Sequence, residues 1–177
     1  MLAAVRKMLA DPDEAWWVVD GALMAMSFAS ADAVRESLPL ILPWTEHEEW
    51  WLRQSAFNAL TALDKDMPVL LEHLPKLVKV LASESHTMAR EGMTSFFARK
   101  LTQNKDNETG RRVLDCLLEA AKKTTIIPDK DGNLRSYEGK YNVYLALDAA
   151  ASRAPESEML RVARAVAENF EVMGTSG

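Results

Sequence analysis

Two nearly identical segments, 34 residues apart, constrain the fold of this chain more than any other feature. Residues 14–18 (Glu-Ala-Trp-Trp-Val) recur as residues 48–52 (Glu-Glu-Trp-Trp-Leu), and small and apolar residues follow each copy. Self-similarity at this period is typical of arrays in which one helix pair packs on the next. Glycine is scarce, with seven in 177 residues, and long stretches are rich in Ala, Leu, Met, Glu, Lys and Arg. These residues favour helices, so the sequence predicts an all-α fold.

The second copy predicts a helix that is packed on two sides. Five of its apolar residues have the spacing of one helical face: Leu52, Ala56, Ala59, Leu60 and Leu63. Trp50 and Phe57, seven residues apart, share a second face. A helix inside a repeat array contacts both its own partner and the next repeat, which explains two apolar faces.

Similar patterns along the chain predict an α-α superhelix of about four helix pairs, preceded by one leading helix over residues 1–10. The pairs cover residues 11–44, 45–83, 85–123 and 138–173, and together they form a single domain over residues 1–177. An inserted loop at residues 124–140 interrupts the array.

The leading helix predicts a surface for self-association. Its apolar residues Leu2, Val5 and Leu9 have no earlier helix to cover them. Because the ends of such arrays normally need polar caps, we expect a homodimer through this uncapped end.

The repeats resemble the HEAT family. Residues 9–14 look like that family's turn between repeats, and Arg53 and Arg90 take similar positions in successive helices. The pairs Leu38-Pro39 and Leu74-Pro75 look like the family's Leu-Pro in the second helix.

This resemblance covers residues 1–103 well and residues 104–173 loosely. The first repeat departs from the pattern, because Val19 stands where the arginine would align. The resemblance implies an α-solenoid whose second helices line a concave surface. It implies no reaction.

A stripe of basic residues follows the presumed second helices. These helices are predicted at residues 32–42, 67–82, 109–123 and 156–171, which are close to neutral, whereas the chain carries a formal charge of −5. The candidate binding residues on the concave face are Arg35, Lys76, Lys79, Arg112, Arg161 and Arg164. We expect a protein or peptide partner there, with an acidic segment. A solvated helix face with i, i+4 ion pairs explains the same charges.

No motif in the sequence predicts an enzyme. The single Cys and the three His have no spacing that suits a structural zinc, and there is no Gly-rich phosphate loop and no nucleophile elbow. We therefore predict a non-catalytic protein with no cofactor and no metal. Cys116 is expected opposite the apolar stripe of its helix, where Arg112 and Lys123 would favour a thiolate.

The tandem tryptophans leave a second functional class open. Neighbouring residues on a helix are ~100° apart, so one ring of each pair should fill a groove between repeats and the other could be exposed. HEAT-like DNA glycosylases use Trp with an acidic residue in a basic cleft, which makes DNA repair an alternative. The sequence pI of about 5.3 argues against a nucleic-acid partner. A third alternative is a structural module of a larger protein.

The inserted loop and the chain start complete the sequence expectations. Residues 127–138 partly match a calcium-binding loop, but Ile127 offers no oxygen at the first position, and a hairpin turning on Asp131-Gly132 or an ordered loop is the rival. The start lacks the apolar core of a signal peptide, and no apolar run approaches the ~20 residues that span a bilayer. We therefore expect a cytoplasmic protein with no membrane association.

Overall fold

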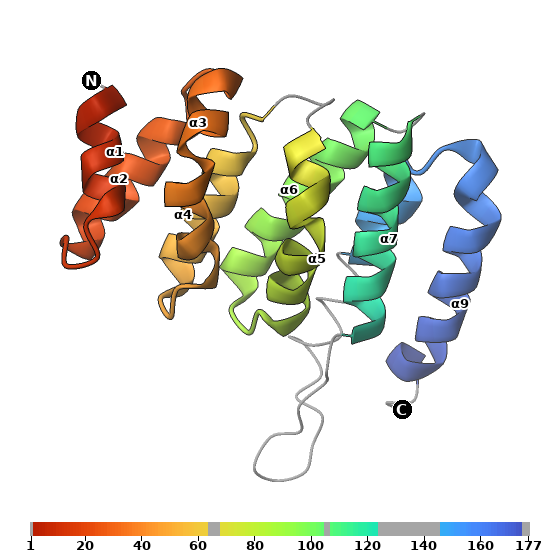
Figure 1. Ribbon diagram of the computed structural model, residues 1–177. Helices are drawn as coiled ribbons and strands as arrows, with labels where there is room; N and C mark the ends of the chain where they lie inside the picture. Colours follow the sequence, from red (N-terminus) through yellow and green to blue (C-terminus); the bar gives the residue numbers. More distant parts are fainter. Residues whose placement is uncertain (1, 64–67, 105–106, 124–145, 175–177) are drawn as a thin grey trace, which may run out of the picture. The chain divides into compact units, whose positions relative to one another are not determined.

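The computed structural model describes residues 2–63, 68–104, 107–123 and 146–174, and all of the regular structure in these ranges is helical (Figure 1). The prediction of an all-α fold is confirmed for this part of the chain. The polypeptide divides into two compact units, Met1–Met67 and Pro68–Gly177, each of which is described by itself.

Unit 1 contains four α-helices and one short 3-10 helix in its described part. They are α1 (Leu2–Ala10), α2 (Trp16–Ser27), α3 (Ala31–Ile41), η1 (Leu42–Glu46) and α4 (Trp50–Leu60). Helix α2 packs against α4, α1 packs against α3, and contacts between α1 and α2 and between α3 and α4 join these two layers. Their core is apolar and almost fully buried: Leu9, Val19, Leu23, Met26, Val34, Ile41, Leu52, Phe57 and Leu60.

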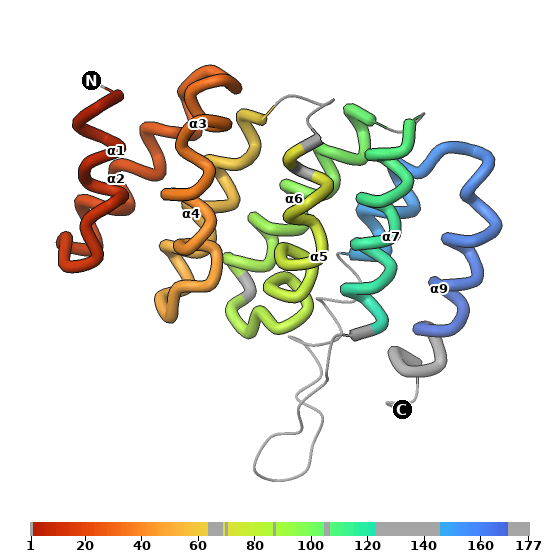
Figure 2. The backbone as a smooth tube through the Cα atoms, viewed as in Figure 1, coloured from red at the N-terminus to blue at the C-terminus, as the bar shows by residue number. Residues whose placement is uncertain are grey.

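Local signals explain where the helices of unit 1 begin and end. Ser30 caps α3, because its side chain accepts a hydrogen bond from the backbone N–H of Ala33 at 3.3 Å. Pro39 lies inside α3, which passes into η1 at Leu42. Helices α2 and α4 then start at the same end of the unit, after the α1–α2 turn and after η1, which is the lower end of the red and orange segments in Figure 2.

Unit 2 is built around α7. Its described elements are α5 (Pro68–Ser83), α6 (Thr87–Asn104), α7 (Glu108–Lys123), a helix over residues 146–153, η2 (Glu156–Glu158) and α9 (Met159–Gly174). Helix α7 packs against α5, α6 and α9. Four large side chains of α6 and α7 are fully buried in this core: Phe96, Phe97, Leu101 and Leu117.

The predicted helices agree closely with the observed ones. The stripe predicted for residues 48–63 is buried in full, and Phe57 on the second face of α4 is buried as well. Pro68 begins α5 and Pro75 lies inside it, at the places that the sequence indicated. The loop at 124–140, with its calcium-loop and hairpin alternatives, lies outside the described residues.

The boundary between the units falls between α4 and α5, inside the predicted repeat over residues 45–83. The division into four repeats and the single domain over residues 1–177 therefore stay predictions.

The expectation that the stripe of the leading helix is uncovered is wrong for Leu9. Leu9 is buried, and Leu2 and Val5 are half-buried, because α1 packs against both α2 and α3. The exposed residues of α1 are Ala3, Ala4, Lys7 and Ala10, which are small or charged, together with Met8, which is 36% exposed. A dimer through the apolar stripe of this helix would have to displace contacts made within unit 1.

Candidate functional site

Five of the six predicted binding residues lie in unit 2. They are placed on three helices: Lys76 and Lys79 on α5, Arg112 on α7, and Arg161 and Arg164 on α9. The sixth, Arg35, lies on α3 in unit 1, where its guanidinium pairs with Asp32 at 2.6 Å. Both partners are exposed, and such a pair adds little stability. The candidate site is therefore sought in unit 2.

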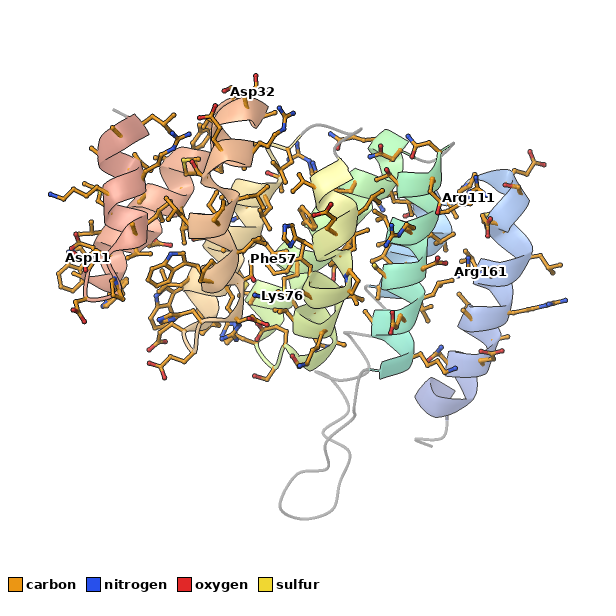
Figure 3. The ribbon with its side chains drawn as sticks, viewed as in Figure 1. Asp11, Asp32, Phe57, Lys76, Arg111 and Arg161 are labelled. Carbon is orange, nitrogen blue, oxygen red and sulfur yellow. The ribbon has the colours of Figure 1, made fainter. Side chains whose placement is uncertain are left out.

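Two of these arginines link neighbouring helices. Arg112 of α7 donates to the carbonyl oxygen of Leu71 in α5 at 3.4 Å. Arg161 of α9 forms an ion pair with Asp115 of α7 and lies 3.5 Å from the carboxylate of Glu158 (Figure 3). The hydrogen bond to Asp115 raises the pKa of Arg161 above its ordinary value, and the nearby charges act in the same direction. Arg112 therefore joins α7 to α5, and Arg161 joins α9 to α7.

A groove of about 700 Å³ runs between α7 and α9. Its charged lining is balanced, with three acids and three bases: Asp115, Glu119, Glu168, Lys122, Arg161 and Arg164. Leu118 and Leu160 give it an apolar floor and rim, and Leu160 is 66% exposed. Because the lining carries acidic and basic side chains on both helices, the groove suits a segment of mixed charge with an apolar side chain.

Arg164 and Lys122 are the exposed cations of this groove for which no ion pair is present among the described residues. Lys79 is also exposed, whereas Lys76 is half-buried. Sequence reasoning identified Arg161 and Arg164 but missed Leu160. The one feature of the sequence that could have pointed to Leu160 as a binding residue is its position next to Arg161.

A second, smaller hollow of about 290 Å³ lies between α6 and the helix over residues 146–153. It is lined by charged and hydroxyl side chains, among them Glu91, Arg99, Asp148 and Thr94. The Thr94 hydroxyl is buried and has no hydrogen-bond partner among the described residues. Residues 124–145 precede this helix and lie outside the described part, so the hollow is not assigned a ligand.

Arg90 is a buried structural cation. Burial lowers its pKa to about 10, while the nearby carboxylate of Glu84 acts in the opposite direction. Its Nε and Nη1 atoms are buried and have no hydrogen-bond partner in the part of the chain that the structure describes. The position therefore belongs to the core of unit 2 rather than to a binding surface.

The expected position of Cys116, away from the apolar stripe, where Arg112 and Lys123 would favour a thiolate, is wrong. The side chain is buried, and the pKa of the thiol is raised to about 12, first by burial and then by the charges of Glu119 and Asp115. The nearby Arg112 lowers the pKa, but it does not offset these causes. A buried protonated thiol is a poor nucleophile.

The expectation that one ring of each tryptophan pair fills a groove between repeats holds only in part, because Trp16 and Trp51 meet between α2 and α4 but no ring of either pair is fully buried. Trp16 is 52% exposed and Trp17 is 62% exposed, while Trp50 and Trp51 are both half-buried. Helix α4 packs against α2, whereas the structure shows no described helix on the outer side of α2. Both Trp16 and Trp17 are therefore exposed.

Two further searches are limited to the described residues. Within them, no group of three or more His, Cys, Asp or Glu side chains could hold a metal ion. None of the helices described is both long and apolar enough to cross a membrane.

Comparison of the chain with protein-family models, curated proteins and solved structures gave no match. Function is therefore argued from the surfaces themselves.

Proposed function

We propose that this protein is a non-catalytic scaffold of HEAT-like helix pairs that binds a protein or peptide partner. The groove between α7 and α9 is the observation that carries the proposal. It combines an exposed Leu160, an exposed Arg164 and carboxylates on both helices, which is the composition of a polar recognition surface with an apolar anchor.

The partner that fits this groove differs from the acidic peptide expected from the sequence. Three carboxylates line the groove beside three cations, so a purely acidic segment would meet repulsion as well as attraction. A helix or extended segment with both charges and one apolar side chain over Leu160 matches the lining better.

The packing order within each unit supports a repeat scaffold. In unit 1, α2 packs on α4 and α1 packs on α3, so that each helix contacts the one two places further along the chain. In unit 2, α5 and α7, and α7 and α9, are related in the same way. Stacked helix pairs produce this order, because each helix then has a neighbour in its own layer.

The DNA-repair alternative has weaker support. The exposed tryptophans on which it depends lie in unit 1. This unit contains 11 Asp and Glu but only 5 Lys and Arg. Nucleic-acid affinity comes mainly from cations that neutralise phosphates. We therefore expect no binding of duplex DNA in a fluorescence-anisotropy titration, even at low salt. Binding with a steep salt dependence would favour this alternative.

Partner capture with matched variants tests the scaffold proposal. The wild-type chain, a groove variant (Leu160→Ser with Arg164→Glu) and the control Arg35→Glu would be used to capture proteins from nuclease-treated source lysate. Arg35 was predicted from the sequence as a binding residue, but it lies on α3 and not in the groove. If the groove is the site, the Arg35→Glu variant should capture the same partner as the wild type. The groove variant should lose that partner. Equal capture by all three proteins would rule out the groove as the site.

A further inference from the structure

Four tryptophans of unit 1 form one connected surface, which we name the tryptophan cluster: Trp16, Trp17, Trp50 and Trp51. The ring centroids of Trp17 and Trp16 are 5.5 Å apart, those of Trp16 and Trp51 are 5.5 Å apart, and those of Trp51 and Trp50 are 5.6 Å apart. The rings meet because α2 and α4 pack side by side and both carry their tryptophans in the first turn.

Helix α2 extends this cluster along its outer side. Met24 follows Trp17 by seven positions, so these two residues share one helical face, and Phe28 is the residue that follows the last turn of α2. Met24 is 54% exposed and Phe28 is 88% exposed. Gly21 lies between Trp17 and Met24 on this face, and a Cβ atom built there would meet nothing within 4 Å. Trp17, Gly21, Met24 and Phe28 form an open apolar strip, the α2 strip, about 16 Å long.

The corresponding face of α4, one sequence repeat later, packs against another helix. A shift of 34 residues places Trp51 and Ser55 of α4 at the positions of Trp17 and Gly21 of α2. In α4 this face is covered by α2, because Trp51 contacts Trp16 and the Ser55 hydroxyl donates to the carboxylate of Asp20 at 2.6 Å. The same face of α2 is exposed, so it has the form of a surface that receives a helix.

Charge defines the chemistry of the occupant. Five carboxylates lie in the turns that lead into the two tryptophan pairs, and none forms an ion pair among the described residues: Asp11, Asp13, Glu14, Glu48 and Glu49. Asp11 is at the α1–α2 turn in Figure 3. Arg53, the nearest base in sequence to the second turn, donates to the carbonyl oxygens of His47 and Glu48. Aromatic faces beside uncompensated carboxylates favour a cation.

We propose that the tryptophan cluster and the α2 strip bind a helical segment of a basic partner protein. Apolar side chains of that segment cover Met24 and Phe28, and its arginine or lysine side chains lie against the tryptophan rings and the acidic turns. A second copy of the chain fits less well, because it would bring another acidic unit 1 and leave the carboxylates uncompensated. This surface is separate from the groove between α7 and α9.

Two labelled synthetic helical peptides test the proposal against the full-length chain. They share one leucine stripe and differ only in carrying arginine or glutamate at the same flanking positions. We expect the arginine peptide to raise its fluorescence anisotropy and to change the tryptophan emission of the protein, and the glutamate peptide to do neither. Trp17→Ala should weaken binding by about tenfold or more, as truncation of an aromatic anchor does.

Matched variants assign the effect to this surface. Asp13→Asn with Glu14→Gln should weaken binding severalfold and make it less dependent on salt. Phe28→Ala provides a second truncation at a side chain that is almost fully exposed and therefore outside the core. Arg164→Ala in the α7–α9 groove should bind the peptide as the wild type does, which separates this test from that of the scaffold proposal.

Three results would overturn the inference. The first is equal affinity for the arginine and glutamate peptides, and the second is unchanged affinity in both Trp17→Ala and Phe28→Ala. The third is a dimer, detected by sedimentation, that Trp17→Ala dissociates and the arginine peptide does not. That result would assign the surface to a second copy of the chain.

Discussion

At the scale of single residues, burial rather than charge spacing decides chemistry in this protein. Arg112 lies four positions before Cys116, which would favour a thiolate if the side chain were exposed. Cys116 is instead packed into unit 2, where removal from water raises the pKa of its thiol. Helical spacing indicates which residues are near one another, but it does not show how much water remains around them.

Cys116 should resist thiol reagents in the native state. At mildly alkaline pH we expect the aromatic disulfide reagent DTNB to label the native protein far more slowly than the denatured protein. Stability should also depend on pH, because the pKa of the folded thiol is about 12, against 9.0 for the ordinary thiol. Below 9.0 the thiol is protonated in both states, and above it only the unfolded state loses the proton. The free energy of unfolding should therefore fall between these values by more in the wild type than in Cys116→Ala.

Arg90 should be far more important for stability than Arg35. Truncation of Arg90 to alanine leaves Glu84 buried without this cation and should cost about 3–5 kcal/mol of unfolding free energy. Arg35→Ala removes one exposed pair with Asp32 and should cost at most about 1 kcal/mol. Urea denaturation of both variants measures the difference. Similar costs would show that Arg90 is not held as the structure indicates.

At the scale of helices, the sequence predicts buried faces well and open faces poorly. The spacing of Leu52, Ala56 and Leu60 predicts the buried face of α4, because a stripe with helical period must be covered by something. Asp20 and Ser27 are the two polar residues of α2, so periodicity alone could not tell its covered face from its exposed one. Only the packing of α2 against α4 distinguishes them.

Pairing between helices was likewise inaccessible to sequence reasoning. The groove between α7 and α9 depends on where α9 lies, and the connecting residues 124–145 carry no periodic signal that fixes its approach. Arg161 and Arg164 are three positions apart and so share one helix face, whereas nothing in the sequence places Asp115 and Glu119 opposite them. A site formed by two helices requires their relative position.

Gly21→Ala should stabilise α2 without disturbing its packing. Gly21 is in the interior of the helix, and an added Cβ atom would contact nothing within 4 Å. Alanine is favoured over glycine there by about 1 kcal/mol, so we expect the free energy of unfolding to rise by about that amount. The buried neighbour Ala22 is the control, and Ala22→Gly should lower stability by a similar amount or more. A loss of stability in Gly21→Ala would mean that the outer side of α2 is already covered.

At the scale of the whole molecule, the two units differ in charge as well as in sequence. Met1–Met67 holds 11 acidic and 5 basic residues, and Pro68–Gly177 holds 15 acidic and 16 basic residues. The net negative charge of the chain therefore resides in unit 1. This asymmetry suits a scaffold with separate surfaces for chemically different partners, because each unit then selects by its own charge.

The division into two units predicts that damage to one core stays local. Leu23→Ala removes a fully buried side chain from unit 1 and Leu117→Ala removes one from unit 2, and each should cost about 2–5 kcal/mol. In an array where helices contact mainly their neighbours, amide hydrogen exchange should accelerate chiefly in the unit that carries the substitution. Exchange measured by mass spectrometry on both variants checks this. If either substitution accelerated exchange equally in both units, the chain would unfold as the single domain predicted from its sequence, and the two surfaces proposed above would be energetically coupled.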